Sequence, residues 1–200
     1  FDVGPQVLIP RVDTEVLAHR AIACLKGVEG NTRVLDLCAG SGCVGISIAQ
    51  RFKNTRAVLV DLSDGALDLC KKNIRRHNLT GRVVHLKGDA MQAPSPALGN
   101  FDILVSNPPY IPTGDIPGLD DSVKNFEPMM ALDGGTDGYD FYRRIAADAP
   151  RFLKDGGVLL LEVGFDQAEG VMALCREAGF REVMAHEDYQ HIDRMVEARL

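Results

Sequence analysis

Short apolar runs alternate along the chain with longer stretches in which apolar residues recur at helical spacing. The runs that predict strands are Thr32–Cys38, Arg56–Asp61, Val83–Lys87, Phe101–Ser106 and Gly157–Val163. The stretches that predict helices are Asp13–Lys26, a segment ending at about Phe52, Gly65–His77, Tyr139–Leu153 and Asp166–Ala178. Two antiparallel strands, Phe180–His186 and Arg194–Leu200, are predicted to end the chain. This alternation predicts an α/β fold with a doubly wound, mostly parallel seven-stranded sheet covered on both faces.

Composition and charge narrow the class of protein. Of the 200 residues, 46% are hydrophobic and 25% are charged, which is typical of one globular domain, here residues 1–200. No apolar run approaches the roughly 20 residues that a membrane helix requires, so we expect a cytoplasmic protein with no membrane partner. The formal net charge of −6 disfavours direct nucleic-acid binding, because such proteins normally present a basic face.

The spacing of cysteines and histidines does not indicate a metal site. The five cysteines are odd in number and contain no CxxC pair. The five histidines also lack the spacing of metal ligands. We therefore expect reduced thiols, as in a reducing compartment, and no bound metal.

The first predicted strand runs into a glycine-bearing turn, in the sequence DLCAGSGCVG. Gly40 and Gly42 have no Cβ, so the backbone can approach a ligand closely there. In doubly wound sheets, ligands bind beyond the carboxyl ends of the strands, which is where this turn lies. Tight packing of strand against helix, with nothing bound, would favour the same glycines.

Acidic residues follow the next two predicted strands. Asp61 ends the second strand about 20 residues after the glycines, where an acid can accept hydrogen bonds from ribose hydroxyls. Asp89 follows the third strand, and Asp36 adds negative charge beside the turn. A solvated carboxylate at a strand end is the alternative for each. Together they favour a nucleoside ligand that carries positive charge, and AGSG is not the GxGxxG of dinucleotide sites.

The segments DLCAGSG, VDLSDGAL, GDA and NPPY, in this order, resemble the motifs of class I S-adenosylmethionine-dependent methyltransferases. The resemblance implies a Rossmann-like domain that binds S-adenosylmethionine and releases S-adenosylhomocysteine. It implies that the methionine part is lined by Cys38, Ala39, Gly40, Ser41 and Gly42. It also implies that Asp61 holds the ribose, that Asp89 and Ala90 lie by the adenine, and that Asn107 faces the methyl group.

The segment SNPPYIP follows the fourth predicted strand, and its prolines end that strand because proline has no N–H for the ladder. In methyltransferases this motif accompanies methylation of planar nitrogens, which are poor nucleophiles because their lone pair is delocalised. Acceptors at the Asn107 side-chain oxygen and the Pro108 carbonyl would increase electron density on such a nitrogen and align it. Pro109 would make the turn rigid and Tyr110 would stack on the planar group. A simple strand-ending turn would use the same residues.

A loop rich in Pro, Gly and Asp follows, from Ile111 to about Gly138. Loops of this length are usually functional or mobile. We expect residues 111–130 to be mobile without substrate and to close over it. The run GGTDGYDFY, which ends the loop, could order it or cap the next helix through Asp137 or Asp140.

Three further segments, LIPRVDTE, FEPMMALDGGTDGYDFYRRI and LLLEVGFDQ, closely resemble the PrmC/HemK family, which methylates glutamine in peptide chain release factors. The resemblance implies methyl transfer to the side-chain amide of the glutamine in the release factor's Gly-Gly-Gln motif. Arg11 and Glu127 lie in these segments, Arg11 either in a salt bridge or against substrate, and Glu162 is expected to be a structural acid at the sheet edge. The family also has an N-terminal helical domain, and the resemblance implies that this chain begins just after it.

The chain departs from the family pattern at Cys38-Ala39, where Gly-Thr is usual, and at Val12-Asp13, where Pro-Glu is usual. Cysteine and alanine fit the turn if their φ angles are negative, so we expect binding to survive. Three alternatives stay open: a glutamine methyltransferase of a ribosomal protein, a nucleic-acid amino-group methyltransferase, and a binding module without turnover. The second would need a basic face for base flipping.

Overall fold

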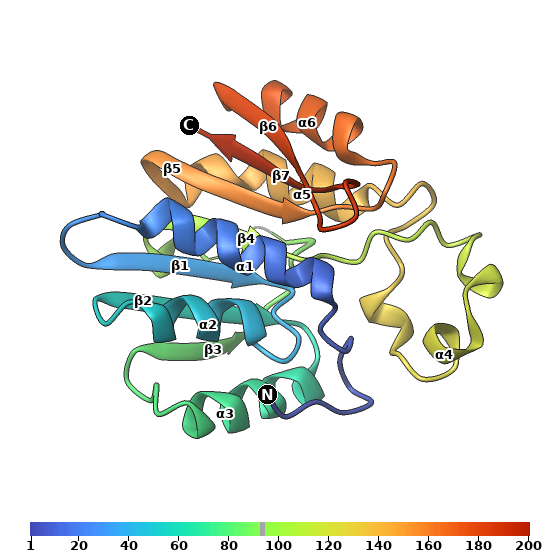
Figure 1. Cartoon of the computed structure of the whole chain (residues 1–200), viewed down its shortest axis with the longest axis horizontal. Coiled ribbons are helices and arrows are strands. Elements are labelled where there is room, and N and C mark those ends of the chain that lie inside the picture. Colours follow the sequence, from blue (N-terminus) through green and yellow to red (C-terminus); the bar gives the residue numbers. More distant parts are fainter. Residues whose placement is uncertain (93–94) are drawn as a thin grey trace.

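The computed structural model describes residues 1–92 and 95–200. One twisted sheet runs through the molecule with the strand order β3-β2-β1-β4-β5-β7-β6 (Figure 1). Its strands are β1 Thr32–Leu37, β2 Thr55–Asp61, β3 Val83–Lys87, β4 Phe101–Ser106, β5 Leu153–Glu162, β6 Glu182–Glu187 and β7 Asp193–Arg199. β1 to β5 are parallel, and β7 pairs antiparallel with both β5 and β6. The predicted fold class and seven-stranded sheet are thus confirmed.

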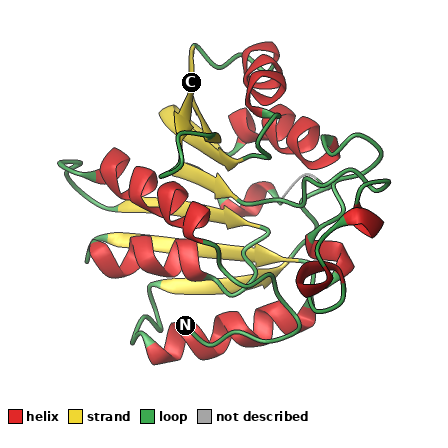
Figure 2. Ribbon diagram, turned by 45° about the vertical axis from the view of Figure 1, so that its right-hand side comes forward, coloured by secondary structure: helices red, strands yellow, loops and turns green. Residues whose placement is uncertain are grey.

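Helices cover both faces of the sheet (Figure 2). The α-helices of the described ranges are α1 Val12–Leu25, α2 Cys43–Arg51, α3 Asp64–Arg76, α4 Asp121–Lys124, α5 Asp140–Asp148 and α6 Ala168–Glu177. Short 3-10 turns are η1 Pro96–Leu98, η2 Ile116–Gly118, η3 Met129–Ala131 and η4 Ala149–Arg151. α1, α2 and α3 share one apolar core with the sheet, and α5 and α6 share the other. Both faces of the central strands are therefore buried, which explains their almost wholly apolar sequences.

The predicted helix Tyr139–Leu153 is shorter in the structure. α5 ends at Asp148, and η4 then carries Pro150, whose ring cannot continue an α-helix. Leu153 already pairs with Phe101, but regular pairing with β4 resumes only at Val158, because β5 bulges between the two positions. The strand predicted from Gly157 therefore matches the regular part of β5, whereas Leu153, predicted as the last residue of the helix, is the first residue of this strand.

The strand order reverses direction at β1 and β4, which lie side by side. Crevices form at such a switch point because the connections from the two strands leave in opposite directions. Residues 1–11 cross this edge of the sheet before α1 begins, and Val7 is buried there at 3% exposure. The segment between β4 and α5 closes the same edge from the side where α4 lies (Figure 1).

Candidate active site

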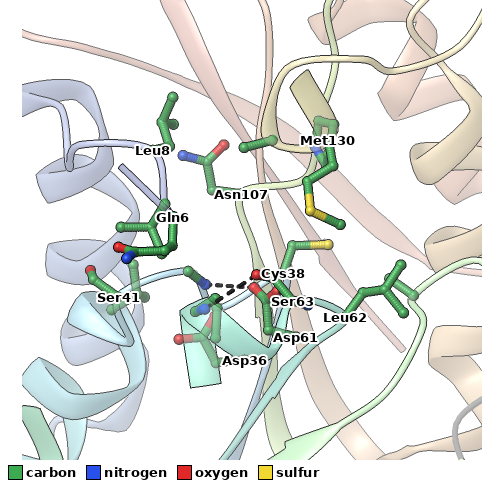
Figure 3. A pocket seen from close by; sticks show the side chains of 18 of the residues that line it. Gln6, Leu8, Asp36, Cys38, Ser41, Asp61, Leu62, Ser63, Asn107 and Met130 are labelled. Carbon is green, nitrogen blue, oxygen red and sulfur yellow. Dashed lines mark hydrogen bonds between the residues drawn. The ribbon is translucent and has the colours of Figure 1, made fainter. Parts of the chain in front are cut away.

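A cavity of about 300 Å³ opens at the carboxyl ends of β1, β2, β3 and β4. Its walls include the predicted residues Cys38, Ala39, Gly40, Ser41, Asp61, Asp89, Ala90, Asn107 and Pro109. In the view of Figure 3, Asn107 and Met130 lie above Cys38, and Asp61 and Ser63 lie below it. Gly42, Pro108 and Tyr110 were also predicted for the site but are not among the residues that line the cavity. The structure thus brings most of the predicted residues around one cavity.

The turn after β1 has a left-handed backbone at several positions. The φ angles are +57° at Cys38, +54° at Gly40 and +80° at Gly42. The expectation of a negative φ at Cys38 is therefore wrong, and this residue carries the strain that a glycine would avoid. Burial raises the pKa of the Cys38 thiol, so the thiol stays protonated and is a weak nucleophile beside the cavity.

Gly42 and Gly45 allow α2 to start close against the sheet. A Cβ at Gly42 would lie 2.9 Å from the Leu59 side chain, and one at Gly45 would lie 2.4 Å from it. The Gly45 N–H also donates to Asp36 Oδ2 at 2.9 Å. Close strand-to-helix packing, the alternative explanation for the glycines, therefore accounts for Gly42, whereas Gly40 lines the cavity.

Asp36 contributes less negative charge than its position in the sequence suggested. It is 2% exposed, and burial raises its pKa to about 7, with Asp61 adding to the shift. Near neutral pH a large fraction of the Asp36 carboxyl is consequently protonated. We infer that its main contribution is to hold the start of α2 through Gly45.

Asp61 lies at the end of β2 with its carboxylate held by the backbone. Its two oxygens accept hydrogen bonds from the N–H groups of Gly40 at 2.8 Å and Ser63 at 2.9 Å (Figure 3). Each carboxylate oxygen can accept more than one hydrogen bond, so both remain available to hydroxyl groups of a ligand. Asp89 is fixed similarly by the N–H of Met91 at 2.9 Å.

The turn after β4 is held in place by residues of the loop and of the segment before α6. Gln167 donates from Nε2 to the carbonyl oxygen of Tyr110 at 3.0 Å. Gly134 and Gly138 pack so closely against Tyr110 that an added Cβ would lie 2.6 and 2.4 Å from its backbone atoms. Burial raises the pKa of the Tyr110 hydroxyl to about 12. The GGTDGYDFY run thus packs the end of the loop onto the Asn-Pro-Pro-Tyr turn.

Behind Asn107, a chain of side-chain hydrogen bonds leads into the protein. Asn107 Nδ2 donates to Thr14 Oγ1 at 3.3 Å, and Thr14 Oγ1 donates to Glu162 Oε2 at 2.8 Å. Thr14 is 6% exposed and Glu162 is 2% exposed. Glu162, the last residue of β5, is therefore a buried acid at the sheet edge, as predicted, and it contacts Thr14 and Asn107.

The long segment between β4 and α5 contains three short helical turns, η2, α4 and η3. Its two ends are tied together, because Ile111 N–H donates to Leu132 O and Gly134 N–H donates to Ile111 O. Arg11 forms an ion pair with the buried Glu127, so the salt bridge is the interpretation of Arg11 that the structure supports. Asp137 accepts from Tyr139 N–H and pairs with Arg143, just before α5.

The sequence analysis missed cavity residues from five segments. They are Gln6, Val7, Leu8, Pro10 and Thr14 near the start of the chain, Cys43 and Val44 at the start of α2, Leu62, Ser63 and Ala66 after β2, Gly88 after β3, and Met130, Ala131, Asp133 and Phe141 at or near the end of the loop. Several lie inside LIPRVDTE and FEPMMALDGGTDGYDFYRRI. Those segments carried the family resemblance, so they were the available signal, although their spacing alone suggested no chemistry.

These features suit S-adenosylmethionine. Gly40 leaves room for the close approach of a ligand, since the nearest atom to an added Cβ is 3.9 Å away. Asp61 offers paired acceptors of the kind that ribose hydroxyls require. The cavity volume is at the small end of the range for ligand sites. Within residues 1–92 and 95–200, no group of three His, Cys, Asp or Glu side chains is placed to hold a metal ion, and no helix is long and apolar enough to cross a membrane.

Sequence comparisons identify relatives of this chain. The family described as "Methyltransferase small domain" matches residues 1–116. A protein of Geobacter sulfurreducens named release factor glutamine methyltransferase is 42% identical, and the match covers 100% of this chain and 68% of the relative. A protein of Clostridium acetobutylicum with the same name is also 42% identical, over 98% of this chain and 68% of the relative.

Solved structures extend the comparison. A release factor-specific protein-(glutamine-N5) methyltransferase of Alicyclobacillus acidocaldarius is 37% identical, with a TM-score of 0.59, covering 100% of this chain and 98% of that one. The catalytic domain of hMettl16 has a TM-score of 0.78, over 99% of this chain and 74% of that one, at 15% identity. The second likeness concerns the fold alone.

Proposed function

The chain belongs to the family of the release factor glutamine methyltransferases, and we propose that it transfers a methyl group from S-adenosylmethionine to the glutamine of the Gly-Gly-Gln motif in a peptide chain release factor. The acceptor atom is the side-chain amide nitrogen. The observation that carries the proposal is the identity of 42% over the whole chain to a relative of that name. Asn107 of the Asn-Pro-Pro-Tyr turn shares the cavity of Asp61 and the glycine-bearing turn, which supports it.

S-adenosylmethionine, when bound, supplies an electrophilic methyl group on a positively charged sulfur. The turn from Cys38 to Ser41 would hold its methionine part, and Asp61 would hold its ribose hydroxyls. Asp89 and Ala90 line the cavity at the end of β3, where the adenine would lie. Because the Cys38 thiol is protonated, it does not compete with the substrate for the methyl group.

The residues after β4 act on the substrate amide. Its nitrogen is a poor nucleophile because the lone pair is shared with the carbonyl. The Asn107 side-chain oxygen and the Pro108 carbonyl would accept its two hydrogens, which orients the nitrogen and raises its electron density. Gln167, Gly134 and Gly138 keep this turn in place through Tyr110, so the acceptors are preorganised.

The test is a methyl-transfer assay with intact release factor and S-adenosylmethionine, followed by peptide mass spectrometry. We expect one added methyl group, on the glutamine of the Gly-Gly-Gln motif. A release factor with glutamate in place of that glutamine is the matched control and should gain no methyl group. Methylation of a ribosomal protein or a nucleic acid in parallel reactions, with the release factor unmodified, would contradict the proposal.

A further inference from the structure

The Asn107 side chain can face the substrate in two ways, because an amide carries a donor on one side and an acceptor on the other. For the reaction, the oxygen has to face the substrate nitrogen, since an N–H there would repel the substrate's own N–H groups. Asn107 is only partly buried, so close packing around its side chain does not fix this choice. Something behind the side chain has to distinguish the nitrogen from the oxygen.

Two hydrogen bonds make this distinction, one from Thr14 to the buried Glu162 and one from Asn107 to Thr14. An ionised carboxylate can only accept hydrogen bonds, so the Thr14 hydroxyl has to donate its single hydrogen to Glu162 Oε2, which lies 2.8 Å away. Thr14 Oγ1 then presents only its lone pairs to Asn107, at 3.3 Å from Nδ2, and the Glu162 carboxylate attracts the same N–H group. The amide nitrogen is therefore drawn toward Thr14, and the oxygen is left on the other side.

We propose that Thr14 and Glu162 are positioning residues that hold the Asn107 amide with its oxygen toward the substrate nitrogen. This inference rests on the proposed function, because it assigns the residues that orient the acceptor used in that reaction. The residues come from three elements distant in sequence, α1, the end of β4 and the end of β5. Thr14 lines the cavity itself, and Glu162 acts only through Thr14 and Asn107.

The protonation state of Glu162 should then be visible in turnover. Burial raises its pKa to about 7, while the hydrogen bonds from Thr14 and Asn107 oppose the shift. The charged and titratable groups that act on it are Asp13 of α1, Cys43 of α2, Tyr110 after β4, Tyr142 of α5 and Arg194 of β7. Arg194 is itself paired with Asp188. A protonated Glu162 can donate a hydrogen bond to Thr14, whose hydroxyl is then free to donate to Asn107. The Asn107 amide can then rotate by half a turn, which exchanges the positions of its nitrogen and oxygen.

The test compares kcat of four variants on intact release factor as a function of pH. In the wild type, kcat should fall as pH falls through about 7. Glu162→Gln and Thr14→Val should each lower kcat roughly 10- to 100-fold, the range found where a residue orients a functional ligand. Both should abolish the fall of kcat near neutral pH and leave the Kd for S-adenosylhomocysteine within about twofold of the wild-type value.

Two further variants separate positioning from structure. Thr14→Ser keeps the hydroxyl and should retain most of the wild-type kcat and its pH profile. Thr32→Val removes another buried hydroxyl, bonded to Thr55 at the far end of the sheet, and should leave kcat unchanged even where it costs stability. Wild-type turnover and pH dependence in Glu162→Gln and Thr14→Val would overturn the inference. A wild-type protein that leaves the release factor unmethylated would instead overturn the proposed function.

Discussion

The two halves of the cavity are built differently. In the half after β1, β2 and β3, here called the cofactor half, backbone N–H groups hold the carboxylates. Ser63 and Gly40 hold Asp61 from two and 21 residues away, and Gly45 holds Asp36 from nine residues away. In the half around Asn107, here called the amide half, side chains hold side chains. Thr14 and Glu162 are separated by 148 residues.

This difference has a consequence for function. Backbone donors are present whatever the side chain, so the cofactor half depends on few identities beyond the acids and glycines. The amide half depends on every side chain in its network, because removing one partner leaves another buried polar group unsatisfied. Substitutions should accordingly separate into those that change cofactor affinity and those that change turnover.

The largest expected effect comes from breaking the amide half at Asn107. Asn107→Ala removes the oriented acceptor and should lower kcat on intact release factor by roughly 10²–10³-fold, the scale for one preorganised polar group. Asn107→Asp still offers an acceptor oxygen and should retain an intermediate kcat. Single-turnover kinetics with each variant, after circular dichroism has verified folding, would measure this. An alanine variant as active as the wild type would refute the role.

A second effect concerns the free energy of unfolding, to which each half contributes one buried carboxyl, Asp36 in the cofactor half and Glu162 in the amide half. Burial raises the pKa values of both Asp36 and Glu162 to about 7 in the folded protein. Between their unfolded pKa values near 4 and about 7, the folded state keeps these protons while the unfolded state releases them, so stability falls as pH rises. Each group accounts for a loss on the order of 3–4 kcal/mol.

Asp36→Asn and Glu162→Gln should each flatten the decline of the unfolding free energy between about pH 4 and pH 7. Urea denaturation at several pH values would measure it. Asp188 serves as the control, because its pKa is lowered in the folded protein and Asp188→Asn should not flatten this window. A variant whose unfolding free energy changes with pH just as that of the wild type does would contradict the raised pKa of the carboxyl that it removes.

A third effect concerns the cofactor half. Asp61→Ala removes the acceptors proposed for the ribose and leaves the N–H groups of Gly40 and Ser63 without their partner. Binding of S-adenosylhomocysteine should weaken by about 1–3 kcal/mol, as for the loss of charge-assisted hydrogen bonds. Calorimetry would measure it, with Asp64→Ala as the control, because Asp64 is exposed and forms an ion pair with the exposed Lys87. Equal affinities of the two variants would refute the assignment.

The same difference explains what the sequence could predict. Asp61, Gly40 and Asn107 could be assigned because each follows a strand directly, and strand ends of a parallel sheet meet at one edge. Thr14 and Glu162 could not be paired, because no local pattern joins positions 148 residues apart. The left-handed φ at Cys38 was missed because cysteine rarely adopts it, and the bulge in β5 because Leu153 continues an apolar helical spacing.

The smallest expected effect concerns the loop between the halves. Residues 117–126 are mostly exposed, whereas Ile116 and Leu132 are buried at 3%. Hydrogen exchange should be fast at 117–126, slower at 132–138, and slowest in β4. Arg11→Gln removes the partner of Glu127 and should speed exchange near position 127 by only a few-fold, since the Arg11 side chain is 46% exposed. Exchange at 117–126 as slow as in β4 would contradict a mobile loop.

The most direct test of the division between the halves is the affinity of Asn107→Ala for S-adenosylhomocysteine, measured by calorimetry beside its kcat. Asn107 lines the same cavity as Asp61, so it could serve either half. We predict a Kd within about twofold of the wild-type value while kcat falls by roughly 10²–10³-fold. A Kd that weakens as much as kcat falls would make Asn107 a cofactor ligand and would contradict its assignment to the substrate amide.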